Sequence, residues 1–429
     1  MKGKVRVRFA PSPTGPLHVG GARTALFNYV FAVAHGGAFV LRFEDTDKDR
    51  SEQVFEDSIH EGLKWMGINW DEEYYQSKRG DIYKRCLDAL RAKNLVYDHD
   101  GGAYFRLPAK ARSVVVDDLI HGPVEFSSKD FDDVVLIKKD GTPTFHFANV
   151  VDDIEMRITH VIRGEDHLSN TPKHILLYEA LGATVPQFAH IPLILNPDRS
   201  KVSKRTGDVA LDDYRQAGYV PEAMINFLAQ LGWSPPDRND FFTFEELTKM
   251  FSLKRVQKAG AVFDVKLLNH INHRYLMQKS LDEYIRLAKP FVAHLKTTSA
   301  GLRSALKLIQ DRAQTLSEIP GLIEYFFSDP QYDKDLLVFK KSSPQKTQAG
   351  LDVALKVLEA LDEKDWQEDK LQQVLDNAIA AESLLPGDLF WPVRIALSGK
   401  EGSPNPVELL AALGKSVSVK RIETAIKKF

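Results

Sequence analysis

Residues 11–21 read Pro11-Ser12-Pro13-Thr14-Gly15-Pro16-Leu17-His18-Val19-Gly20-Gly21 and stand between a strand-like and a helix-like segment. The preceding Val5–Phe9 alternates as a half-buried strand does, and the following Gly21–Ala34 has the apolar spacing of a helix. A loop between a strand and a helix start suits anion binding, because backbone N–H groups there attract phosphate and His18 can add a hydrogen bond. Taken alone, the stretch is equally compatible with a Pro/Gly-rich turn that carries a surface histidine.

Strand and helix signals alternate on both sides of a middle segment. Further strands are predicted at Phe39–Phe43, Ile158–Ile162 and His190–Leu195, and helices at Ser51–Met66 and from Thr171, which acts as the cap before Pro172, to Gly182. This order predicts a parallel sheet in an α/β nucleotide-binding, Rossmann-like domain.

The middle segment is predicted to be a β-rich insertion that splits this domain. Its expected strands are Ala103–Leu107 and Val114–Val116, which can pair within the insertion, and a hairpin in which Asp140-Gly141 joins Val134–Ile137 to Thr144–Phe147. After about residue 200 helical patterns dominate, at Pro221–Leu231, Glu245–Phe251 and Ala349–Leu361, with a polar connector over Lys340–Gln348. The chain should therefore end in an all-α half.

Composition sets outer limits on the class of protein. With 429 residues, 43% of them hydrophobic, the chain can form several folded domains. Cys86 is its single cysteine, which favours a reducing compartment and excludes a cysteine-rich zinc site. The uncharged stretch Thr24–Leu41 contains Asn28, His35 and two glycines, so we expect a helix, a turn and a strand there and no membrane span. A net charge of -2 leaves a nucleic-acid partner open.

A second motif, Lys201-Val202-Ser203-Lys204-Arg205, follows the last predicted strand of the α/β domain. Lysine is a flexible point charge that can follow a pyrophosphate leaving group as its charge shifts. By itself the pentapeptide is more simply a basic surface loop.

The two motifs together resemble the paired signatures of class I aminoacyl-tRNA synthetases, and the flanking segments resemble bacterial-type glutamyl-tRNA synthetase. These segments are Arg8–Gly15, Gly20–Leu26, Leu41–Asp47, Ala148–Asp153 and Val161–His167. The resemblance spans nearly the whole chain and is strongest up to about residue 275. The absence of Gly-x-Gly-x-x-Gly after the first strand also disfavours a dinucleotide-binding dehydrogenase.

The resemblance implies an ATP-dependent enzyme that activates glutamate as glutamyl-adenylate and transfers it to the 3′-terminal adenosine of tRNA(Glu). ATP, Mg²⁺, glutamate and tRNA are the implied cofactors and partners, and we expect a cytoplasmic monomer. The implied domains are a Rossmann-like first half (1–94), an abbreviated acceptor-end-binding insertion (95–150), the second half (151–195), a stem-contact helical domain with the lysine loop (196–278) and a helical anticodon-binding domain (279–429).

The same resemblance assigns roles to individual residues. The catalytic residues would be His18, Lys201 and Lys204, and the ATP-binding residues Ser12, His18, Gly20, Asp166, Lys201, Ser203 and Lys204. For tRNA, Arg312 would read the third anticodon base, while Arg106, Lys110 and Arg112 would face phosphates. We expect no protein-held metal.

A glutamate pocket needs at least two cations and one anion, because the substrate carries two carboxylates and an ammonium. By resemblance, Arg8 would bind the side-chain carboxylate, Arg163 the other carboxylate and Glu44 the ammonium. Arginine's fixed fork suits carboxylates. Asn149 would add a hydrogen bond, and Phe145 stands where the family usually has a tyrosine.

Two further departures from the family pattern are the short segment Asp98–Ser113 and His270 in place of a tryptophan. Four alternatives remain: an enzyme that also charges tRNA(Gln), a glutamyl transferase that acts on a modified tRNA base, a silent tRNA-binding paralogue and a small-molecule adenylating enzyme. The long helical tail argues against the transferase and the adenylating enzyme, and the retained His18 and lysine loop argue against the silent paralogue.

Overall fold

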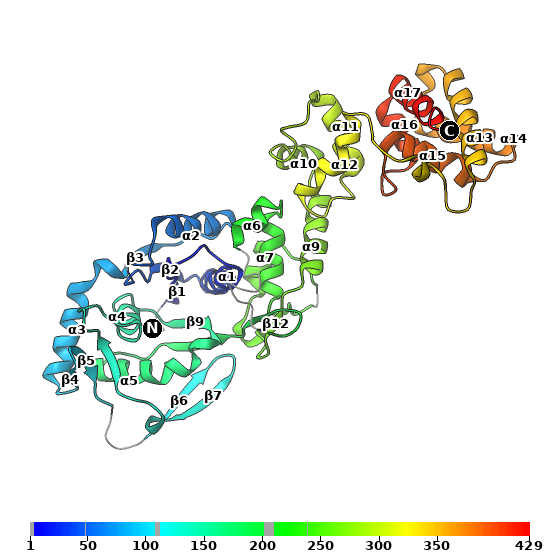
Figure 1. Ribbon diagram of the computed structural model, residues 1–429. Coiled ribbons are helices and arrows are strands. Elements are labelled where there is room, and N and C mark those ends of the chain that lie inside the picture. The colour runs from blue at the N-terminus through cyan, green and yellow to red at the C-terminus, as the bar shows by residue number, and fades with distance from the viewer. Residues whose placement is uncertain (1–3, 48, 108–111, 201–209, 238) are drawn as a thin grey trace. The chain divides into compact units, whose positions relative to one another are not determined.

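The computed structural model describes residues 4–47, 49–107, 112–200, 210–237 and 239–429. The predicted site residues Lys201, Ser203, Lys204 and Lys110 lie outside these ranges. The chain divides into two compact units, Met1–Ile271 and Asn272–Phe429, and helix α9 (Val265–Gln278) runs across the division (Figure 1). No helix of the described residues is long and apolar enough to cross a membrane.

The first unit is built on the predicted parallel sheet. Strands β1 (Arg6–Phe9), β2 (Ala38–Phe43) and β3 (Glu72–Tyr75) pair in that order, all parallel. They are connected by α1 (Val19–Ala34) and α2 (Gln53–Trp65), and α3 (Gly80–Ala92) follows. Helix α1 begins two residues earlier than its sequence pattern predicts, which makes His18 its N-cap.

The second half of the α/β domain continues the parallel arrangement. Strands β9 (His160–Gly164) and β10 (Gln187–Ile191) are parallel, and α5 (Thr171–Leu181) connects them. Strand β9 lies beside β1, where Thr159 N donates to Arg6 O at 2.9 Å. The predicted strand His190–Leu195 is wrong as one element, because Pro192 separates β10 from a short β11 (Ile194–Leu195). Asn170 rather than Thr171 occupies the cap of α5, whereas Gly182 ends it with φ 76° as predicted.

The insertion contributes to two sheets. Strands β4 (Val96–His99), β5 (Gly102–Phe105) and β8 (Val134–Ile137) form an antiparallel sheet. Strand β6 (Ser113–Asp118) pairs with β7 (Gly122–Ser127) and also lies beside β10, so β5 and β6 both pair within the insertion as expected, although in different sheets. The hairpin of β6 and β7 thereby forms one edge of the sheet that contains β9 and β10.

The predicted second arm of the Asp140-Gly141 hairpin is a helix. The turn forms, since Lys138 N donates to Thr142 O at 2.8 Å, but Phe145–Glu155 is helix α4 with Thr144 at its N-cap. Buried Phe147 belongs to the core of the domain together with Tyr83, and this long-range packing outweighs the local alternation. Phe145 and Asn149 consequently lie one turn apart on the same helix.

The first unit ends in helices that cover the sheet. They are α6 (Leu211–Gln216), α7 (Pro221–Gln230) and α8 (Phe244–Met250), with the short strand β12 (Ala261–Val262) parallel to β11. Helices α7 and α8 pack on α1, where the Phe27 and Phe251 rings lie 5.2 Å apart. The predictions for α7 and α8 are confirmed to within a residue.

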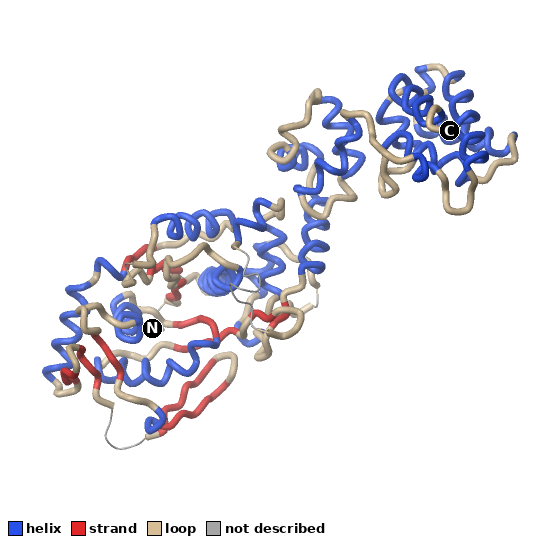
Figure 2. The backbone as a smooth tube through the Cα atoms, in the orientation of Figure 1, coloured by secondary structure: helices blue, strands red, loops and turns tan. Residues whose placement is uncertain are grey.

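The described residues of the second unit form helices without strands (Figure 2). They are α10 (Leu281–Ala288), α11 (Ser299–Ile309), α12 (Ile319–Ile323), α13 (Pro344–Ala360), α14 (Glu368–Ala381), α15 (Pro386–Ser398), α16 (Pro406–Leu413) and α17 (Lys415–Ile426). The predicted connector is only partly correct, because Ser343 caps α13 and the helix begins at Pro344. Gly350 allows α13 to approach α15, since a Cβ there would meet Asp388 O at 2.0 Å.

Candidate functional site

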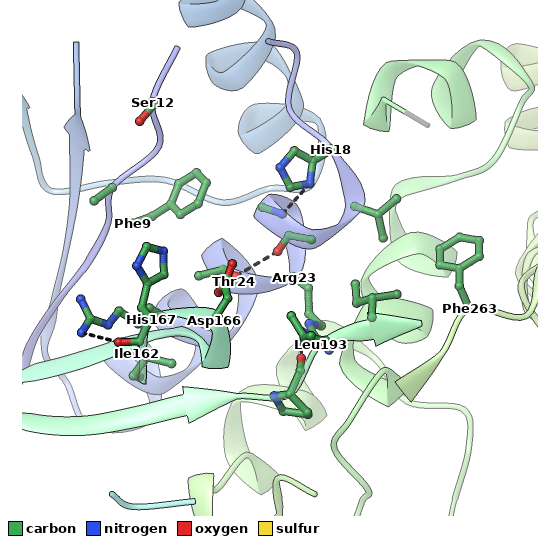
Figure 3. A pocket seen from close by; sticks show the side chains of 18 of the residues that line it. Phe9, Ser12, His18, Arg23, Thr24, Ile162, Asp166, His167, Leu193 and Phe263 are labelled. Carbon is green, nitrogen blue, oxygen red and sulfur yellow. Dashed lines mark hydrogen bonds between the residues drawn. The ribbon is translucent and has the colours of Figure 1, made fainter. Parts of the chain in front are cut away.

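A cavity of about 1040 Å³ opens in the first unit at the carboxyl ends of β1 and β9 (Figure 3). Its walls come from the loop after β1, the start of α1, helix α4, the end of β9 and the segments 192–197 and 262–266. A crevice at the carboxyl ends of parallel strands is the usual ligand site of an α/β fold.

One side of the cavity has the geometry of a phosphate site. His18 caps α1, and its Nδ1 accepts from Gly21 N at 3.3 Å. Ser12, His18 and Asp166 all line this side (Figure 3), as does Gly20. A Cβ on Gly164 would meet Asp166 Oδ1 at 2.5 Å, so that glycine makes room for the carboxylate. The predicted ATP-binding residues within the described ranges therefore line one cavity, with His18 and Gly20 at the start of α1.

The other side of the cavity contains the predicted glutamate-binding residues. Arg8, Glu44, Phe145, Asn149 and Arg163 all line it. Asn149 Nδ2 donates to Glu44 Oε1 at 3.2 Å, and Arg42 Nη2 donates to the same oxygen at 3.2 Å. Burial raises the pKa of Glu44, while Arg42 and Asn149 oppose that shift.

A buried network of ion pairs lies behind the predicted glutamate-binding residues. Asp153 accepts from Arg42 Nη1 at 2.6 Å, from Arg8 Nε at 3.1 Å and from Tyr178 Oη at 3.2 Å. Burial disfavours the charge on Asp153, but Arg8 and Arg42 outweigh it and hold the pKa of this carboxyl below its usual value. Asp152 accepts in turn from Arg79 Nε at 2.6 Å. Arg8 is thus held in place by a carboxylate that it shares with Arg42.

Arg163 has a different environment. Its guanidinium donates to His190 Nε2 at 3.2 Å, Thr171 Oγ1 at 2.8 Å and His167 O at 3.3 Å. Within the described residues it forms no ion pair with a carboxylate. Burial lowers the pKa of Arg163 to about 10, and the nearby charge of Arg8 adds to the shift. A buried cation at the wall of a cavity, paired only with neutral groups, suits an anionic ligand.

The predicted tRNA contacts are spread over both units. Arg106 stacks its guanidinium 5.2 Å from the Tyr97 ring centroid, and Arg112 is already paired with Glu179 of α5. A phosphate at Arg112 would have to compete with that carboxylate. In the second unit, Arg312 follows α11 and donates to Gly402 O at 3.3 Å, with its side chain 34% exposed.

Sequence reasoning assigned no role to several groups that shape the cavity. Arg42 and Asp153 organise its floor, and the segment 262–266 forms its far wall. A charged residue inside the apolar strand Phe39–Phe43 and an acidic pair at Asp152-Asp153 were signals for the buried network. The segment 262–266 had no comparable signal. Among the described residues no group of three histidine, cysteine or acidic side chains could hold a metal ion.

Comparisons with known proteins agree with this arrangement. The family of class I tRNA synthetases (E and Q), catalytic domain, matches residues 4–104 and 98–270, and an anticodon-binding domain family matches residues 283–426. A glutamate–tRNA ligase of Akkermansia muciniphila is 40% identical over 437 residues, covering 98% of each chain, and one of Caldicellulosiruptor saccharolyticus is 39% identical over 485 residues with the same coverage.

Solved structures give the same result. The crystal structure of a glutamate tRNA ligase from Elizabethkingia meningosepticum, in complex with its amino acid, superposes with a TM-score of 0.90 at 32% identity and covers 99% of both chains. A glutamate-tRNA synthetase structure from Elizabethkingia anophelis gives a TM-score of 0.87 at 32% identity. With its split α/β catalytic domain and its helical second unit, this chain belongs to the class I tRNA synthetases of the glutamate and glutamine group.

Proposed function

We propose that this protein is a glutamate–tRNA ligase, which uses ATP to activate glutamate and then esterifies it to the 3′-terminal adenosine of tRNA(Glu). The observation that carries the proposal is one cavity that combines two buried arginines and a carboxylate only 10% exposed with a helix start capped by His18. This charge pattern matches an amino acid with two carboxylates and one ammonium. The names of relatives that align over nearly the whole chain support the same function.

The reaction has two steps and needs no covalent enzyme intermediate. The glutamate α-carboxylate attacks the α-phosphorus of ATP, which forms glutamyl-adenylate and releases pyrophosphate. A ribose hydroxyl of the terminal adenosine then attacks the acyl carbon and releases AMP. Both steps require reactants to be positioned and developing negative charge to be stabilised, which is what binding groups without a nucleophile can supply.

Residues of the phosphate side would bind the nucleotide. Backbone N–H groups at the start of α1 and the ring of His18 would face the phosphates, with Ser12 and Gly20 beside them. Lys201, Ser203 and Lys204, outside the described residues, would contact the departing pyrophosphate. Mg²⁺ is usually held by phosphate oxygens, water and one or two carboxylates, and Asp166 is a carboxylate on this side. When bound, the ion would neutralise phosphate charge.

Residues of the opposite side would bind glutamate. Arg8 would contact the side-chain carboxylate, Arg163 the other carboxylate and Glu44 the ammonium. An ammonium ion beside Glu44 would favour the ionised carboxylate and offset the effect of its burial. Phe145 and Asn149, one turn apart on α4, would complete the wall of the pocket.

The remaining assignments follow from the family. The insertion (95–150) would contact the acceptor end, residues 196–278 the stem and residues 279–429 the anticodon, in a cytoplasmic monomer. A matching anticodon-binding family over residues 283–426 favours charging of a whole tRNA over transfer of glutamate to a modified base. Charging of tRNA(Gln) as well as tRNA(Glu) is the open alternative.

Aminoacylation of purified tRNA(Glu) and tRNA(Gln), side by side with radiolabelled glutamate, tests both the proposal and the alternative. We expect tRNA(Glu) to be charged at least tenfold more efficiently, and the absence of charging of either tRNA would refute the proposal. In the same assay, Lys204→Ala should lower kcat by roughly two to three orders of magnitude, as loss of one transition-state donor does elsewhere. An unchanged rate would leave the lysine loop without a catalytic role.

A further inference from the structure

A fully buried acid–imidazole pair lies directly behind Arg163. Asp118 ends strand β6 of the insertion, and His190 belongs to the neighbouring strand β10. Asp118 Oδ2 lies 2.6 Å from His190 Nδ1 and 3.1 Å from the backbone N of His190, and both side chains have no exposed surface. The pair does not line the cavity, and the proposed reaction leaves it without a role.

The hydrogen bonds fix the tautomer of His190. Because the Asp118 carboxylate can only accept, Nδ1 of His190 must carry the proton that it donates. Nε2 therefore presents a lone pair, which accepts from Arg163 Nε at 3.2 Å. Burial lowers the pKa of His190, so the ring is neutral in this position. A chain of carboxylate, neutral imidazole and guanidinium results.

The carboxylate of Asp118 balances the charge of Arg163 through the imidazole of His190 and not by direct contact. A carboxylate in direct contact would stabilise the guanidinium but would also occupy some of the donors that a substrate carboxylate can use. Arg8 illustrates the direct arrangement, since it contacts Asp153 at 3.1 Å. In the case of Arg163, one imidazole separates the cation from Asp118. The lone pair of His190 orients the Nε side of the guanidinium, while Thr171, His167 and His174 contact the other two nitrogens.

We propose that Asp118 and His190 are positioning residues that hold Arg163 ready to bind a carboxylate of the amino acid substrate. The inference rests on the proposed function, because it takes glutamate as the ligand of Arg163. It also means that strand β6 of the insertion supports the amino acid pocket from behind its lining, in addition to the expected contact of the insertion with the acceptor end of tRNA.

Asp118→Asn tests this series of hydrogen bonds, because the amide has nearly the same shape as the carboxylate. The amide oxygen can still accept from the backbone N–H groups of Ile120 and His121, as Asp118 Oδ1 does at 2.9 Å. The amide nitrogen would then face His190 Nδ1, which favours the other tautomer and turns a donor towards Arg163, the kind of error that makes an analogous substitution in a catalytic triad costly. We expect the KM for glutamate to rise at least tenfold in aminoacylation, with kcat changed less than threefold and the KM for ATP unchanged.

His190→Asn is the second variant, because the Asn amide can take the place of Nδ1 and donate to Asp118, while the contacts of Nε2 with Arg163 and Thr171 are lost. It should raise the KM for glutamate to a similar extent. Asp117→Asn is the matched control, since Asp117 is the exposed neighbour on β6 and carries the same charge. It should leave the KM for glutamate unchanged.

The Asp118→Asn substitution is repeated in an Arg163→Lys variant, to separate a positioning role of Asp118 from a general loss of structure. Glutamate affinity is measured there by the rise in unfolding temperature with ligand, which requires no activity. Asp118→Asn should weaken binding less than twofold in that background, because the group through which it acts is gone. A glutamate KM unchanged in either folded variant, a fall in kcat alone, or an equal loss of affinity with and without Arg163 would overturn the inference. If the wild-type protein fails to charge tRNA with glutamate, the proposed function fails instead.

Discussion

Asp153→Asn should strongly destabilise the first unit without changing the shape of the residue. The Asp153 carboxylate is fully buried and accepts from Arg42, Arg8 and Tyr178 at 2.6, 3.1 and 3.2 Å. The amide can keep part of these hydrogen bonds but removes the charge that balances two buried guanidiniums. Removal of one partner from a buried ion pair costs about 3–5 kcal/mol, and the retained hydrogen bonds place this variant near the lower value, at roughly 3 kcal/mol.

Hydrogen–deuterium exchange read peptide by peptide measures this loss in the first unit alone, which a whole-protein melting curve of two units would not. Amides of β1, β2 and α4 should exchange roughly two orders of magnitude faster, since about 1.4 kcal/mol corresponds to a factor of ten. Peptides from α13 and α15 should be unaffected.

Glu155→Gln is the control for Asp153→Asn. It makes the same chemical change on the same helix, but Glu155 pairs with Arg85 at 3.5 Å where their side chains are 37% and 65% exposed. An exposed pair of this kind contributes at most about 1 kcal/mol. If Asp153→Asn accelerates exchange no more than Glu155→Gln does, the buried network does not stabilise the floor of the pocket.

Three further predictions concern the pocket, the anticodon and acid stability. Phe145→Tyr should lower the KM for glutamate about fivefold in aminoacylation, because a hydroxyl at the pocket wall adds a hydrogen bond of about 1 kcal/mol; an unchanged or higher KM would contradict this. Arg312→Gln should reduce kcat/KM for tRNA(Glu) at least tenfold and leave that for tRNA(Gln) unchanged, whereas equal effects on both would refute base reading. Burial lowers the pKa of both His146 and His167 to about 4, with nearby cations adding to the shift. Since the unfolded chain takes up these protons near pH 6.5 and the folded chain only near pH 4, stability should fall as the pH decreases through that window, and His146→Asn should reduce the pH dependence of the urea midpoint.

Local signals were sufficient for much of the fold. The strand Val5–Phe9, the following helix and the end of α5 at Gly182 were predictable because alternation, helical period and a left-handed C-cap are properties of a few adjacent residues. The segment Thr144–Phe147 was not, since its aromatic residues fit a strand locally. Its helical state depends on the burial of Phe147 in the core with Tyr83, a residue more than sixty positions earlier.

In the candidate site, too, local sequence patterns predict the position of some residues and not of others. Arg8 and Arg163 lie near the carboxyl ends of the parallel strands β1 and β9, and Glu44 follows β2, so their meeting at one edge could be expected from the motifs. The groups that hold them could not. Asp153 contacts Arg8 across 145 positions, and Asp118 contacts His190 across 72 positions through a strand pairing that no local pattern encodes.

The burial of Arg163 accounts for a requirement for the substrate carboxylate that this arginine is proposed to bind. Arg163 lost most of its hydration when the protein folded, and its pKa of about 10 reflects that burial. The substrate carboxylate assigned to Arg163 compensates this buried cation, whereas an amide or an alcohol in place of that carboxylate would leave the guanidinium without an anion. A site in which the wrong ligand leaves buried polar groups unpaired distinguishes ligands far better than a site that excludes them by size alone. Selectivity would therefore arise because Arg163 has already lost its water when the protein folds. A carboxylate of the protein in direct contact with Arg163 would remove this selectivity. Asp118, one imidazole away, stabilises the cation without cancelling that selectivity.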